Sequence, residues 1–186
     1  MGFFAPASAE LLVVDLDGAG GHELVVGGAV RGWGSKTLIG VVRSTPDGFR
    51  LTHIAQLAAD EAIAGTVAID PRPGAHAVLA TIVRGGTHYL TTFAGPTLER
   101  THELALTGRF HLNGAADVDA DGAPELFGLR MDDGVAGIGR PEVRALSSGA
   151  VEWTELPQRT ATSISAIALD ADPALELVYT RRASPV

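Results

Sequence analysis

The sequence predicts an all-β fold built from four-stranded antiparallel units, and three observations lead to that prediction. Apolar residues come in short runs, the 23 glycines and 10 prolines fall between those runs, and one strand–loop–strand pattern recurs along the 186 residues. Short apolar runs bounded by Gly and Pro are typical of strands joined by turns. No stretch sustains a 3.6-residue period for three turns, which disfavours helices.

The recurring pattern has four copies that align without gaps. They read VVDLDGAGGHELVVG from Val13, VAIDPRPGAHAVLA from Val67, AADVDADGAPELFG from Ala115 and AIALDADPALELVY from Ala166. Each copy has an apolar strand, an acidic or turn-rich loop and a second apolar strand. The aligned acidic residues are Asp17, Asp70, Asp119 and Asp170. Their separations of 53, 49 and 51 residues are too regular for chance acidic clusters, so we interpret the copies as structural repeats.

Two further strands follow the loop in each complete repeat. In the second repeat, Gly85-Gly86 separates residues 76–83 from 87–93, and Gly95-Pro96 leads to a strand at 98–106. The first and third repeats carry comparable turn sequences. A repeat is therefore four antiparallel strands in roughly 50 residues, which is the size of a β-propeller blade.

We expect one β-propeller-like domain over residues 1–186, with about three and a half blades. The blade boundaries are predicted at about 10–60, 61–108 and 109–160, with a half blade at 161–182. A sandwich or a solenoid would also explain the strands, but not an acidic loop at the same point of every repeat. Because a propeller buries its edges only by closing a ring, exposed edges should favour homo-oligomers. Two chains could pair head to tail into seven blades, or the chain could be a fragment of a longer protein.

The third loop has the strongest metal-ligand pattern. In DVDADGAPE, alternating acidic residues aim carboxylates into one turn, Gly122 permits a positive φ, and Glu125 can close the far side. Calcium takes six to eight oxygen ligands in a flexible geometry, which suits this loop better than zinc or magnesium would. Neighbouring carboxylates also repel one another without a cation. The alternative is that Asp and Gly serve only as turn residues.

The segment DVDADGAPEL resembles the FG-GAP or VCBS repeat, whose D-x-D-x-D-G-x-x-D-L loop occurs in integrin α-chain propellers and many bacterial surface proteins. The resemblance extends through four repeats and implies that the loop joins the two innermost strands of a blade. It also implies calcium binding through positions one, three, five and nine and a carbonyl at position seven. Carried over, these ligands are Asp117, Asp119, Asp121, Glu125 and the carbonyl of Ala123. Glu at position nine departs from the family, which usually has Asp there.

The first and fourth loops keep part of this pattern. The first keeps Asp15, Asp17 and Glu23 but has Ala at position five, so its calcium site should be weaker. The fourth keeps Asp170, Asp172 and Glu176 but has Ala at position one and Pro in place of Gly. Whether the fourth loop binds calcium stays open.

The second loop keeps only Asp70, with Arg72 at position five and His76 at position nine. A guanidinium would replace a metal ion rather than bind one. We therefore predict no metal at this loop.

Composition and charge exclude several functions. A net charge of −8 with scattered basic residues argues against nucleic-acid binding. The chain has no Cys, which rules out disulfides and thiolate chemistry. Its apolar runs fall far short of the ~20 residues of a membrane helix. The start MGFFAPASAE lacks the regions of a signal peptide, so we expect an extracytoplasmic or secreted location only through a longer parent protein.

No motif points to catalysis. The chain lacks a G-x-S-x-G elbow, and His102-Glu103 begins a zincin motif whose second His is absent. Trp33 and Trp153 could lie on a ligand-binding surface or pack between blades. We expect a non-enzymatic module that binds a protein or a glycan; the alternatives are a lectin-like propeller and the accessory domain of a secreted hydrolase.

Overall fold

The structure is a computed structural model that describes residues 10–29, 37–131, 139–156 and 160–181. These residues form fourteen β-strands, and no helix is found among them. The expected all-β class is therefore confirmed. Nor does the described part of the chain hold a helix long and apolar enough to span a membrane.

The strands fall into three four-stranded antiparallel units and a final hairpin. Unit 1 contains β1 (Glu10–Val14), β2 (Glu23–Ala29), β3 (Thr37–Thr45) and β4 (Gly48–Ile54). Unit 2 contains β5 (Glu61–Ile69), β6 (Ala77–Arg84), β7 (Thr87–Ala94) and β8 (Glu99–Leu106). Unit 3 contains β9 (Phe110–Ala116), β10 (Glu125–Arg130), β11 (Arg140–Ala145) and β12 (Val151–Thr154). The terminal hairpin contains β13 (Ala161–Ile167) and β14 (Glu176–Arg181).

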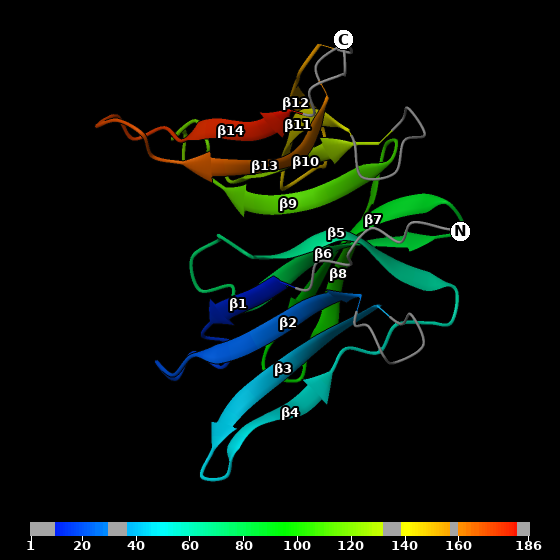
Figure 1. Cartoon of the computed structure of the whole chain (residues 1–186), viewed down its shortest axis with the longest axis vertical. Helices are drawn as coiled ribbons and strands as arrows, with labels where there is room; N and C mark the ends of the chain where they lie inside the picture. The colour runs from blue at the N-terminus through cyan, green and yellow to red at the C-terminus, as the bar shows by residue number, and fades with distance from the viewer. Residues whose placement is uncertain (1–9, 30–36, 132–138, 157–159, 182–186) are drawn as a thin grey trace.

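Within each unit every strand pairs with the next one along the chain. Units 2 and 3 join into one eight-stranded sheet through a single parallel bridge between Gly65 of β5 and Leu112 of β9. Gly65 has a φ of 88°, and a Cβ there would lie 2.5 Å from the Leu112 carbonyl oxygen, so the close approach requires glycine. Figure 1 shows the units following one another in chain order from the bottom to the top of the view.

The described residues form three apolar core clusters, each lying between consecutive units. The first joins unit 1 to unit 2, the second joins unit 2 to unit 3, and the third joins unit 3 to the terminal hairpin. Neighbouring residues of one strand serve different clusters: Val78 belongs to the first and Leu79 to the second. The middle strands β6 and β7 of unit 2 are thus buried on both faces, which explains why β6 is apolar from Ala77 to Val83 except at Thr81.

Candidate metal centres

The loop between β9 and β10 gathers four carboxylates. Asp117, Asp119, Asp121 and Glu125 each offer an oxygen, and these oxygens all lie within 4.8 Å of one another. The last residue pair of the β9–β10 ladder is Ala116 with Glu125. This pairing brings Asp117, at position one of the loop, close to Glu125, at position nine. All four acidic residues that the sequence pattern selected therefore meet in one place and could hold a metal ion.

Backbone amides fix the orientation of these carboxylates. The Val118 amide donates to Glu125 Oε2 at 2.7 Å, and the Gly122 amide donates to Asp117 Oδ2 at 3.0 Å. Gly122 has a φ of 88°, as the sequence required of that position. The loop is held by local hydrogen bonds from its own backbone amides to its carboxylates.

The amides of Asp121 and Ala123 make the corresponding bonds to Asp119 and Asp121, at 3.2 and 2.7 Å. Ala123 lies exposed in the loop. The role of its carbonyl as a fifth ligand stays a prediction.

The electrostatics of this loop favour a cation. Burial raises the pKa of Glu125, and the charges of Asp119, Glu152 and Asp117 raise it further against the opposing Val118 hydrogen bond. Asp117 Oδ1 is buried and accepts no hydrogen bond. No described Lys, Arg or His forms an ion pair with the four carboxylates. Oxygen-only donors, clustered charge and an orphaned buried oxygen fit a calcium ion better than a softer metal.

The loop between β1 and β2 also brings together its predicted residues Asp15, Asp17 and Glu23. Here, however, Arg43 of β3 reaches into the cluster and lies 3.3 Å from Asp17 Oδ2 and 3.0 Å from Glu23 Oε1. The guanidinium already balances charge that a metal ion would otherwise balance. A weaker site was expected because of a missing ligand, whereas the structure adds a competing cation.

Asp15 differs from its counterpart in the third loop. Although desolvation opposes ionisation, hydrogen bonds from the Gly20 and Gly18 amides and the charge of His76 lower the pKa of Asp15. His76 comes from the β5–β6 loop, and its Nδ1 lies 2.8 Å from the Asp15 carbonyl oxygen. The acidic loops of units 1 and 2 are therefore in contact.

The loop between β13 and β14 gathers Asp170, Asp172 and Glu176 as its three carboxylates. The Leu169 amide donates to Glu176 Oε2 at 2.7 Å, which repeats the Val118–Glu125 bond of the third loop. This cluster is more open to solvent than the third, because both its aspartates are exposed. It remains a possible metal site with fewer ligands.

The β5–β6 loop departs from the gap-free alignment. Its last strand pair is Ile69 with Val78, so Asp70 directly follows the paired strand. Asp15 and Asp117 hold that place in units 1 and 3. In strand register Asp70 therefore corresponds to position one and not, as the sequence suggested, to Asp17 and Asp119 at position three. The sequence alignment missed this because a two-residue shift in pairing leaves no mark on a short Gly/Pro-rich loop.

Asp70 is buried, and the Arg72 guanidinium forms hydrogen bonds to both of its carboxylate oxygens. The Arg72 amide also donates to Asp70 Oδ1 at 3.1 Å. Arginine thus balances the buried carboxylate, in keeping with the expected replacement of a metal by a guanidinium. That no metal binds here stays a prediction.

Comparison with known proteins adds no relative. No protein-family model, curated protein or solved structure matches the chain. The resemblance to the FG-GAP or VCBS repeat therefore rests on the loop sequences alone.

Arg43 belongs to the first candidate site although the loop pattern did not indicate it. Glu23 lies one position beyond the Leu24–Val42 pair, which places Arg43 beside it on the neighbouring strand. In unit 3 the corresponding residue is Ala145, the partner of Glu125. The position of Arg43 in β3 could have indicated this contact, but only once the pairing register of β2 and β3 is known.

The sequence also selected Trp33 and Trp153 as candidate ligand-binding residues. Trp33 lies outside the described residues.

Proposed function

We propose that the chain belongs to a calcium-stabilised, non-enzymatic β-propeller module of the FG-GAP or VCBS kind, which binds a protein or glycan partner. In this proposal units 1 to 3 are blades, the terminal hairpin is the inner half of a fourth blade, and the acidic loops cross-link the innermost strands. Rigidity comes from the cations, and recognition takes place elsewhere on the module.

The order and packing of the units support the blade assignment. In each unit the first strand contacts the neighbouring units: β5 contacts β1 and β9, and β9 contacts β13. Each unit is a meander that buries apolar side chains against the next unit, and units 2 and 3 do so on both sides. This is the arrangement expected of blades around an axis, and a flat two-layer sandwich would not give three successive inter-unit cores.

One observation carries the calcium proposal. Asp117, Asp119, Asp121 and Glu125 direct oxygens to a common point, and no described cation balances them. Removing buried or neighbouring carboxylates from water without a counter-charge is unfavourable. A bound divalent cation supplies that counter-charge and ties β9 to β10.

The test is the melting temperature of chelator-stripped protein from zero to 5 mM calcium. A ligand that binds only the folded state must raise this temperature, and we expect Asp119→Asn to lose most of the rise. Asp60→Asn, an exposed aspartate outside all four loops, is the matched control and should keep the rise. A melting temperature that does not respond to calcium sinks the proposal.

A location outside the cytoplasm forms part of the same proposal. It predicts a calcium dissociation constant of about 10⁻⁴ to 10⁻³ M, which is the range of extracellular calcium modules. Isothermal titration calorimetry gives the constant directly. A value near 10⁻⁸ M would instead indicate a cytosolic buffer and argue against an extracytoplasmic module.

A further inference from the structure

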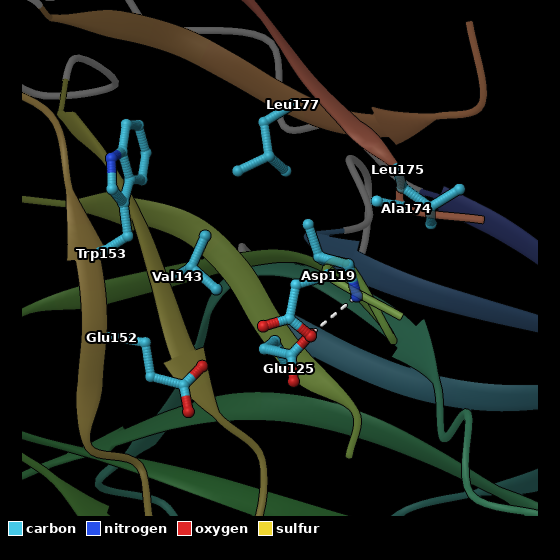
Figure 2. A pocket seen from close by; sticks show the side chains of 9 residues that line it. Asp119, Glu125, Val143, Glu152, Trp153, Ala174, Leu175 and Leu177 are labelled. Atoms are coloured by element: carbon cyan, nitrogen blue, oxygen red, sulfur yellow. Dashed lines mark hydrogen bonds between the residues drawn. The ribbon is translucent and has the colours of Figure 1, made fainter. Parts of the chain in front are cut away.

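The two joints that unit 3 makes with its neighbours differ in charge. Between unit 3 and the terminal hairpin lies a cleft of about 450 Å³, lined in part by the acidic residues Asp119, Glu125 and Glu152. Figure 2 shows the carboxylates of Glu125 and Glu152 below the indole ring of Trp153 and the side chain of Leu177. This cleft belongs to the candidate metal centre of the third loop. The joint between units 2 and 3 instead encloses two histidines beside arginines.

His88 of β7 connects unit 2 to unit 3. Its side chain is only 3% exposed, and Nδ1 lies 2.8 Å from the carbonyl oxygen and 3.3 Å from the amide nitrogen of Phe110, the first residue of β9. The ring of His111, also on β9, stacks on the His88 ring with the two ring centres 6.0 Å apart. Both imidazoles therefore lie at the contact between the two units.

The positive charges beside this pair come from unit 3. Arg144 of β11 is fully buried, with its guanidinium 4.8 Å from the centre of the Phe110 ring. Desolvation lowers the pKa of His88, and the charges of Arg109 and Arg144 lower it further against the opposing hydrogen bond to Phe110. Desolvation and the charges of His88 and Arg109 lower the pKa of His111 from 6.5 to about 4.

The other charged groups on this side of unit 3 surround Arg144. Glu142 of β11 lies 2.6 Å from the Arg144 guanidinium, and Arg130 of β10 lies 3.8 Å from Glu142 Oε2. The carboxylate of Glu142 is therefore already opposed by arginines. β13, which also contacts β9, carries no titratable residue from Ala161 to Ile167.

The charges of unit 2 lie mainly on its other face. His88 pairs with the uncharged Val83 of β6 and Leu106 of β8. Arg84 and Arg100 lie over the rings of Tyr89 and Phe93, which alternate with His88 along β7.

The carboxylates Glu61 and Glu103 pair with those two arginines and belong to the same network. On the His88 side, β8 carries His102, which is exposed.

Few directional bonds hold this joint together. The parallel bridge between Gly65 and Leu112 is the only strand pairing between units 2 and 3 in the described part of the chain. The remaining contact is the second apolar cluster, which includes Leu79, Leu90 and Leu126. Because the other ladders run within a unit, the joint can open without unpairing either four-stranded meander.

We propose that the joint between units 2 and 3 is an acid-sensitive switch, in which proton uptake by His88 and His111 separates unit 3 from unit 2 and exposes the apolar cluster between them. An imidazolium at either position places a desolvated positive charge beside arginines, and opening the joint returns that charge to water. The inference requires neither a metal ion nor a binding partner.

The direction of the pH dependence follows from proton linkage. Well above pH 6.5 both rings are neutral in the closed and the open joint. As the pH falls below 6.5, the open joint binds protons that the closed joint does not bind, so the closed joint loses stability. For His111 alone, the opening equilibrium constant rises about 30-fold between pH 7.5 and pH 5.

The test uses introduced cysteines, because the chain has none of its own. Leu126→Cys places a thiol in the cluster between units 2 and 3, and Ile39→Cys places one in the cluster between units 1 and 2; both side chains are fully buried. Labelling by 4,4′-dithiodipyridine is measured in chelator at pH 7.5 and pH 5, relative to a free cysteine peptide. We expect the relative rate to rise about 30-fold at position 126 and less than about twofold at position 39.

Histidine variants identify the groups that take up the protons. His111→Phe keeps an aromatic ring beside His88, and His88→Asn keeps a polar group near the place of Nδ1. In the Leu126→Cys background, the two changes together should abolish the rise in labelling. His102→Asn, which replaces the exposed histidine of β8, is the matched control and should keep the full rise.

Three labelling results would overturn the proposal: a rate at position 126 that does not change with pH, an equal rise at position 39, which indicates global unfolding, or a rise that persists in the double histidine variant. Circular dichroism checks that each variant is folded. A proton NMR titration of the six histidines in the unchanged protein needs no substitution. At least two imidazoles should titrate well below pH 6.5, and six ordinary titrations near pH 6.5 would contradict the switch.

Discussion

The 15–23 loop and the 117–125 loop start from nearly the same pattern and reach different electrostatic states. Both gather carboxylates at the end of the first hairpin of a unit, and both close on a glutamate that accepts an amide hydrogen bond at position two. Arg43 reaches the first cluster, whereas Ala145 stands at the corresponding place in unit 3. One unit therefore balances its acidic loop with an arginine of its own, whereas in unit 3 the corresponding position carries no charge.

The strongest way to break this comparison is to give the third loop the arginine of the first. Ala145→Arg places a guanidinium beside Glu125, and we expect it to displace calcium without changing any ligand. At a calcium concentration of about 100 times the dissociation constant, the lost stabilisation is about 2.7 kcal/mol. Calcium-dependent melting temperatures measure the loss.

The control is Ala105→Arg, which adds the same charge at an exposed position on β8 and should keep the calcium response. If Ala145→Arg responds to calcium as the unchanged protein does, cation competition does not distinguish the two loops.

The reciprocal change removes the arginine from the first loop. Arg43→Met keeps the aliphatic stem but removes the guanidinium that pairs with Asp17 and Glu23, so we expect one additional calcium site formed with Asp15. With three carboxylates the site is weaker, and saturating calcium should add about 1 to 2 kcal/mol of stability. Calorimetric stoichiometry should rise by one. Arg50→Met, which removes an exposed arginine paired with Asp47, should leave the stoichiometry unchanged.

Neutralising the closing glutamate should have opposite effects in the two loops when calcium is absent. Glu125→Gln relieves repulsion and should stabilise the calcium-free protein by about 1 kcal/mol. Glu23→Gln breaks the pairing with Arg43 and should destabilise the protein by a similar or smaller amount. Chemical denaturation in chelator gives both free energies of unfolding. The same sign for both variants would show that Arg43 does not set the difference.

The smallest effect concerns pH. Folding raises the pKa of Glu125, so the protonated carboxyl favours the folded state. This contribution to the free energy of unfolding is lost as the pH rises through the folded-state pKa.

Glu61 is the opposite case, because hydrogen bonds from Arg100 lower its pKa from 4.5 to about 2. The contribution of Glu61 to the free energy of unfolding is therefore lost as the pH falls through that range.

In chelator, the unchanged protein should therefore lose stability relative to Glu125→Gln as the pH rises from 4.5 to neutrality. The difference for Glu61→Gln should instead shrink as the pH falls from 4.5 towards 2. Denaturation curves across these two ranges test both directions. Parallel pH profiles for the two variants would contradict the assigned environments.

Much of the local structure was readable from the sequence. Turn residues such as Gly85-Gly86 correctly marked the hairpin between β6 and β7, because a tight turn needs residues that tolerate positive φ. The acidic spacing correctly selected Asp117, Asp119, Asp121 and Glu125 as residues that meet, because a loop of eight residues between the paired Ala116 and Glu125 cannot place them far apart. Such short-range geometry depends on the chain nearby.

Tertiary structure alone decided which charges meet across strands and units. The register of β3 brings Arg43 to Glu23, the shifted pairing of β5 and β6 moves Asp70 out of its aligned place, and the packing of unit 3 against the terminal hairpin forms the acidic cleft. Each of these depends on a pairing or packing choice between segments distant in sequence. Sequence spacing fixes which groups a loop can present, and only the folded arrangement fixes what balances them.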